Sequence, residues 1–159
     1  MNTDQIRKQV LLRASRERVW NAITDAKKFG TWFGAEFDAG FVAGERVRGR
    51  IAPTKMDPEA AKAQEPHAGT EFDVIVDRIE PMQRFSFRWH PGEADGPDTD
   101  PMTLVTFELD EAQGGILLTI TESGFDRIPI ERRARAFELN DGGWAAQTKL
   151  IEKYLQHAA

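Results

Sequence analysis

The sequence predicts an α+β protein in which an antiparallel β-sheet packs against one long C-terminal helix. Between residues 130 and 155, one set of residues recurs in alternating steps of four and three, the spacing of a helix with a single buried stripe. Before this helix, short segments alternate apolar and polar residues, as half-buried strands do. The sheet is therefore the expected partner of the stripe. The stripe consists of Ile130, Ala134, Phe137, Asp141, Trp144, Thr148, Ile151 and Leu155.

The N-terminal part predicts one strand followed by two helices. Residues 6–12 alternate apolar and polar side chains, which indicates a strand. Ser15 is a suitable N-cap for a first helix that Gly30 would close. Residues 31–34 are expected to form a second, very short helix or turn that carries two large aromatic side chains.

The middle of the chain predicts a run of antiparallel hairpins, which gives a sheet of about six or seven strands in total. Residues 53–69 are interpreted as a long mobile loop, although 58–64 could form a helical turn. Residues 91–101 hold three Pro, two Gly and four acidic residues and are also expected to be a loop. The expected strands are 36–41, 45–51, 71–79, 85–89, 103–109 and 116–122.

Composition favours a single domain, 1–159, located in the cytoplasm. The 159 residues suffice for a sizeable core, and no apolar run has the length of a signal peptide or a membrane span. The net charge of −5 argues against nucleic acid or an anionic membrane surface as a partner. The absence of Cys excludes disulfides and thiolate chemistry.

No metal and no cofactor is expected. His67, His90 and His157 lack the short spacing that metal ligands favour, and the acidic loop of Asp95, Asp98 and Asp100 lacks the calcium-loop pattern. Ser123 lacks the glycines of a nucleophile elbow. The arginines are interpreted as solvated faces, with an inward-pointing Arg50 as an alternative. These arginines are Arg46, Arg48, Arg50, Arg127, Arg132, Arg133 and Arg135.

The aromatic residues give the strongest sign of a binding site. Most of them fall on predicted inward faces, and a curved sheet around one helix tends to leave a void for a ligand. Gly142 and Gly143 would add space among the rings; the alternative is a filled aromatic core. The predicted pocket comprises Trp32, Phe33, Arg50, Phe72, Phe87, Trp89, Phe107, Phe125, Phe137, Asp141 and Trp144.

Two carboxylates are candidates for a catalytic or anchoring role. Asp141 falls on the predicted buried stripe, and Glu122 lies at the end of the last strand. A buried carboxylate must be paired or must serve chemistry, because its burial is costly. The alternative is that the helix kinks at Gly142 and Gly143, each of which costs about 1 kcal/mol relative to Ala, so that Asp141 turns to solvent.

Three stretches resemble the START-like (SRPBCC) superfamily, and within it the group named after the activator of the ninety-kilodalton heat-shock protein's ATPase. They are residues 14–24 with Trp32-Phe33 after them, residues 121–125, and residues 140–144 followed by Leu150 and Tyr154-Leu155. The resemblance implies a helix-grip fold, in which a curved sheet wraps the C-terminal helix. It does not select one function, because this superfamily includes lipid and hormone carriers, cyclases and co-chaperone domains.

Three hypotheses follow. The first is a protein that binds a small apolar or aromatic molecule between sheet and helix. The second is a cyclase- or hydrolase-type enzyme that uses Asp141 or Glu122 as acid or base. The third is a protein-interaction module with a chaperone partner. A homodimer is left open.

Overall fold

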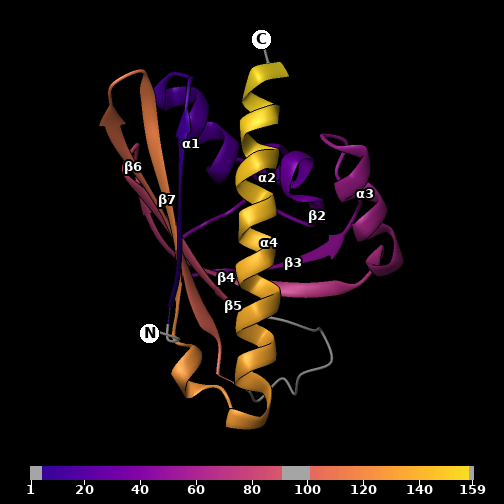
Figure 1. Cartoon of the computed structure of the whole chain (residues 1–159). Helices are drawn as coiled ribbons and strands as arrows, with labels where there is room; N and C mark the ends of the chain where they lie inside the picture. Colours follow the sequence, from indigo (N-terminus) through magenta and orange to yellow (C-terminus); the bar gives the residue numbers. More distant parts are fainter. Residues whose placement is uncertain (1–4, 91–100, 158–159) are drawn as a thin grey trace.

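A seven-stranded antiparallel sheet curves around the C-terminal helix α4 (Ile130–His157), which confirms the predicted helix-grip architecture (Figure 1). The computed structural model describes residues 5–90 and 101–157. The sheet order is β1-β7-β6-β5-β4-β3-β2. The predicted loop at 91–100 lies outside the described residues. The strands are β1 (Gln5–Leu12), β2 (Ala35–Phe37), β3 (Arg46–Ile51), β4 (Glu71–Glu80), β5 (Arg84–Trp89), β6 (Thr103–Ala112) and β7 (Gly115–Ser123).

Two short helices follow β1, as predicted, but the boundary between them differs. Ser15 caps α1 (Arg16–Thr24) by accepting a hydrogen bond from the Arg18 backbone N–H. This helix ends at Asp25, whose carboxylate accepts from the Lys28 N–H and so starts α2 (Ala26–Phe33). Gly34, at a φ of 97°, ends α2. The prediction of one helix up to Gly30 was wrong because Asp25 acts as a second N-cap.

Residues 58–64 form a helix, α3 (Pro58–Gln64), so the loop prediction was wrong there. Asp57 caps it by accepting from the Ala60 N–H, and Pro58 suits the first turn. The Lys153 ammonium on α4 donates to Asp57 at 2.6 Å. The hydrogen bonds from Lys153 and from the Ala60 N–H lower the pKa of Asp57. A short 3-10 turn, η1 (Glu65–His67), follows.

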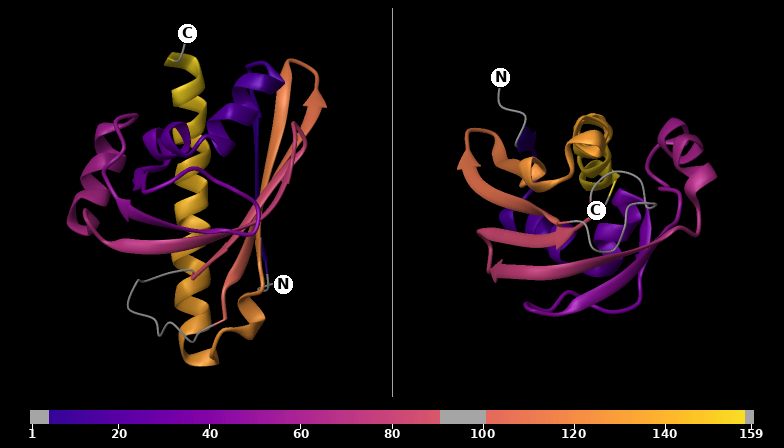
Figure 2. Two further views of the ribbon diagram at one scale, coloured as in Figure 1. Left: turned by 180° about the vertical axis from the view of Figure 1, so that it is seen from behind. Right: turned by 90° about the horizontal axis from the view of Figure 1, so that it is seen from below.

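The concave side of the sheet is covered by α1, α2 and α4 together (Figure 2). Polar contacts join α2 to α3 and to α4. Gln64 of α3 and Gln147 of α4 both donate to the Phe33 carbonyl oxygen at the end of α2, each at 3.0 Å. No helix in the described part of the chain is long and apolar enough to cross a membrane.

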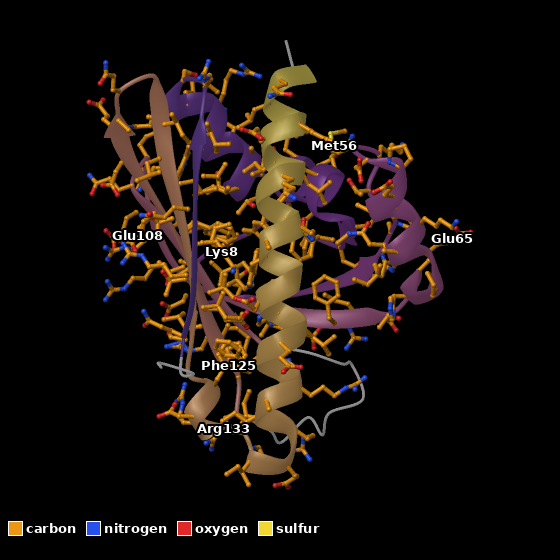
Figure 3. All side chains as sticks on the ribbon, viewed as in Figure 1. Lys8, Met56, Glu65, Glu108, Phe125 and Arg133 are labelled. Carbon is orange, nitrogen blue, oxygen red and sulfur yellow. The ribbon has the colours of Figure 1, made fainter. Side chains whose placement is uncertain are left out.

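The convex side of the sheet carries ion pairs between neighbouring strands. Asp73 of β4 bonds both Arg46 and Arg48 of β3, at 3.0 and 3.2 Å. Partial burial alone would raise the pKa of Asp73, but the hydrogen bonds from these arginines outweigh it and lower the pKa. Arg84 and Glu108 form a similar pair at 2.9 Å, and Glu108 points away from α4 (Figure 3).

Helix α4 is continuous through the glycine pair, so the predicted kink is absent. Its buried side differs from the predicted stripe: Ile130 is 76% exposed, whereas Ala136 and Leu150 are buried. Gly142 and Gly143 face solvent, and a Cβ added to either would meet no atom within 4 Å. The idea that they make room in a pocket was therefore wrong. The regular steps of four and three therefore gave only part of the buried side, which includes Trp144, Ile151 and Leu155 of the predicted stripe.

Replacing Gly142 by Ala is expected to stabilise the protein by about 0.5–1 kcal/mol, because Gly is unfavourable in an exposed helix interior. The free energy of unfolding in urea measures this. Gly49→Ala is the control, for which we expect the opposite change in the free energy of unfolding. A Cβ there would lie 2.9 Å from the rings of Phe37 and Phe72, so we expect a loss of stability. A destabilised Gly142→Ala variant would contradict the continuous helix.

Candidate functional site

The most unusual residue of the interior is Glu122, which is 0% exposed. Along β7, alternate residues point toward α4, and Leu118 and Ile120 are buried apolar members of this strand. Glu122 lies between Ile6 of β1 and Val105 of β6 in the strand register. A carboxylate therefore occupies a position where its strand neighbours are apolar. Such burial is costly unless both oxygens are hydrogen-bonded.

Four side chains donate hydrogen bonds to the Glu122 carboxylate. The indole N–H groups of Trp89 and Trp144 lie 2.9 and 2.8 Å from its oxygens. The Thr103 hydroxyl donates at 2.5 Å, and the Asn140 amide nitrogen reaches both oxygens, at 2.8 and 3.0 Å. An ionised carboxylate is an acceptor only, and this donor set suits it. We call Glu122 and these four residues the Glu122 cluster.

The Glu122 cluster is assembled from three strands and one helix. Trp89 ends β5 and pairs directly with Thr103, the first residue of β6. Asn140 and Trp144 are four residues apart on α4 and so share a face. The hydrogen bonds consequently fasten α4 to the sheet at the end of these strands.

Rings surround the Glu122 cluster in direct contact with one another. The centroids of Trp89 and Trp144 are 5.7 Å apart, and that of Phe33 lies 6.0 Å from each. Phe107 is 5.8 Å from Trp144, and Phe72 is 6.4 Å from Trp89. Most of these rings are buried, but Trp89 and Phe72 are only half-buried. The accessible aromatic surface of the cluster is therefore on these two residues.

The structure places the other predicted pocket residues at several locations. Trp32 and Phe87 are buried further along the same aromatic network. Phe125 and Phe137 form a separate pair, with centroids 5.2 Å apart, where β7 leads through η2 (Phe125–Arg127) into α4 (Figure 3). Whether any of these residues contacts a ligand stays a prediction.

Asp141 and Arg50 do not join the Glu122 cluster. Asp141, with its side chain 47% exposed, forms an ion pair of 2.9 Å with Lys8 of β1. Arg50 bonds Asp38 at 2.8 Å. The polar residue of α4 that meets Glu122 is Asn140, one position before the one predicted. Asn140 and Thr103 were missed by sequence reasoning, because apolar periodicity gives no signal for inward polar residues.

The geometry limits what Glu122 can do chemically. Both of its oxygens are engaged by protein donors, so it cannot accept a substrate proton unless one donor leaves. Asn140 is only half-buried, whereas Thr103 and Trp144 are buried. Trp89 is half-buried as well, so an incoming molecule would reach the carboxylate from the side of Trp89 and Asn140.

A curved antiparallel sheet that holds a C-terminal helix, with two helices after the first strand, defines the START-like class of proteins. Within this class, the sequence profile described as "Activator of Hsp90 ATPase homolog 1-like protein" matches residues 13–156. The chain belongs to that family. A search of curated protein sequences found no match.

Solved structures agree with this assignment. DynU16, a protein of the dynemicin biosynthetic locus, is similar with a TM-score of 0.67 and 25% identity over 97% of this chain. This chain covers 48% of DynU16, about half its length. Protein MLL2253 from Mesorhizobium loti has a TM-score of 0.71 and 22% identity over 98% of both chains. The Aha1 dimer from Colwellia psychrerythraea has a TM-score of 0.70 and 15% identity over 96% of both chains. These last two show the fold alone.

Replacing Thr103 by Val should destabilise the protein by about 1–3 kcal/mol, because one hydrogen bond to a buried carboxylate is lost while the shape is kept. Chemical denaturation followed by circular dichroism measures the change. Thr121→Val on β7 is the matched control: its hydroxyl forms no hydrogen bond among the described residues. Equal stability of the two variants would contradict an energetic role of the Glu122 cluster.

Proposed function

We propose that this protein binds a small apolar or aromatic molecule between the concave side of the sheet and α4, at the Glu122 cluster. One observation carries the proposal. The half-buried rings of Trp89 and Phe72 lie beside each other, and Trp89 donates a hydrogen bond to the buried carboxylate of Glu122. Binding sites for small molecules combine mainly apolar and aromatic walls with a few oriented polar groups. The cytoplasmic location expected from composition stays a prediction.

The cost of the Glu122 cluster supports a functional role. Replacing buried ionic groups by well-packed apolar residues often leaves a protein equally or more stable. Leu or Ile at position 122 would continue the apolar face formed by Leu118 and Ile120. A carboxylate at this position is therefore better explained by recognition of a ligand than by packing alone.

The two other hypotheses have less support. Catalysis by Asp141 is disfavoured because its half-exposed carboxylate is paired with Lys8 of β1 and lies outside the Glu122 cluster. An interaction module would need a broad exposed apolar patch. In the described part of the chain the exposed large apolar residues are Val42, Met82, Ile130 and Leu139, spread over a loop, a turn and α4. The location of the DynU16 gene in a biosynthetic locus also fits small-molecule binding better.

Phe72→Ala should weaken binding of a neutral aromatic probe, N-phenyl-1-naphthylamine, by about ten- to hundredfold, because the loss of one aromatic contact is worth roughly 1.5–3 kcal/mol. Probe fluorescence gives the affinity, and circular dichroism verifies folding. Val42→Ala is the control, because Val42 is exposed and lies outside the aromatic network. If both variants bind as wild type does, or the wild type does not bind, the ligand site is misplaced.

We also propose that two copies of the chain associate through the outer side of α4. The solved Aha1 neighbour is a dimer, and Leu139 is exposed on the outer side of α4. Leu139→Glu should raise the dissociation constant of the dimer about tenfold or more, because a charge replaces a buried apolar contact. Light scattering after size-exclusion chromatography measures the mass, with Val42→Glu as control. A monomeric wild type would contradict this proposal.

A further inference from the structure

We infer that the ligand of this site is a cation: a small aromatic amine or amidine whose N–H groups bind Glu122 in place of Asn140. The inference rests on the proposed binding function and adds the charge of the ligand. Anionic molecules of the same shape are excluded by the same carboxylate.

The first argument is the charge of the Glu122 cluster. Trp89, Thr103, Asn140 and Trp144 are all neutral donors. No Lys, Arg or His in the described part of the chain forms an ion pair with Glu122. The nearby cation on β1, Lys8, is paired with Asp141 instead. The buried negative charge is thus hydrogen-bonded but not neutralised, and in a partly dry interior it attracts a cation more strongly than it would in water.

The second argument is the arrangement of the rings. A cation is attracted to the faces of aromatic side chains, and several rings together form the usual binding site for organic ammonium groups. The indole N–H edges of Trp89 and Trp144 are directed at Glu122, and their planes are tilted by 31° to each other. Phe72 meets Trp89 at an interplanar angle of 79°. A molecule beside the half-buried Trp89 would therefore lie next to aromatic rings and near the carboxylate.

The third argument is the position of Asn140. Its single amide nitrogen bridges both carboxylate oxygens, at 2.8 and 3.0 Å. An ammonium or an amidinium presents two or more N–H donors and can occupy the same place. Because Asn140 is half-buried on α4, a rotation of its side chain would open this place without moving the buried donors Thr103 and Trp144.

Three probes with one ring system test the charge directly: tryptamine, which is a cation at neutral pH, tryptophol, which is neutral, and indole-3-acetate, which is an anion. Isothermal titration calorimetry on the wild-type protein gives the three affinities. We expect tryptamine to bind about tenfold more tightly than tryptophol, and indole-3-acetate to bind at least about tenfold more weakly than tryptophol.

The four tryptophans of the chain report the location of binding. In a spectrum of ¹⁵N-labelled protein, the indole N–H signals of Trp89 and Trp144 should shift on addition of tryptamine. Those of Trp20 and Trp32 should stay in place, because Trp32 donates to the Ala22 carbonyl oxygen and neither indole bonds Glu122. Shifts confined to Trp20 and Trp32 would overturn the inference.

The variant Glu122→Gln removes the charge and should bring the three affinities within about twofold of one another. Glu111→Gln, on the exposed end of β6, is the matched control and should keep the wild-type order. The wild-type order decides the question even if Glu122→Gln fails to fold. Equal affinities in the wild type would overturn the inference about charge and leave the binding function intact. If none of the three probes binds, the proposed function falls with it.

Discussion

The orientation of α4 on the sheet depends on how a single buried carboxylate is hydrogen-bonded. Glu122 would weaken the core if it were left without partners, yet donors from β5, β6 and α4 converge on it. Its hydrogen bonds therefore define how the long helix sits on the sheet, since Asn140 and Trp144 must both reach the same group. Apolar packing alone is less directional and would tolerate small rotations of α4. The polar contact thus orients a helix whose other buried residues, apart from Trp144, are aliphatic.

The two sides of the sheet use side chains in opposite ways. On the concave side, Trp89 and Phe87 belong to a continuous network of touching rings. On the convex side, Asp73 and its arginines form ion pairs between strands, in which the arginines are exposed and Asp73 is partly buried. The strand period of two separates these environments residue by residue. Because the convex side is strongly charged, the concave side is the natural location for an apolar ligand.

Sequence reasoning predicted the architecture because alternation in strands and the long helical period are strong signals. It named Glu122 as a candidate because of its position at the end of the last predicted strand. It selected Asp141 instead of Asn140 because one residue is a rotation of only 100° around a helix, and apolar patterns do not define a face that sharply. Helix α3 was missed although Asp57 and Pro58 are an ordinary start signal. The convergence of donors from separate elements leaves no local pattern, so only the structure reveals it.

Helix α3 is attached to the rest of the protein in a way that separates its stability from that of the core. None of its side chains is fully buried. It is held by the Lys153–Asp57 ion pair and by the Gln64 amide, which donates to Phe33 and accepts from the Thr54 N–H. Its detachment would expose little apolar surface, so this segment belongs to the least cooperative part of the structure. Salt weakens exposed ion pairs and leaves apolar packing intact. Ionic strength is therefore a means of loosening one flank of the sheet–helix interface while the aromatic core stays folded.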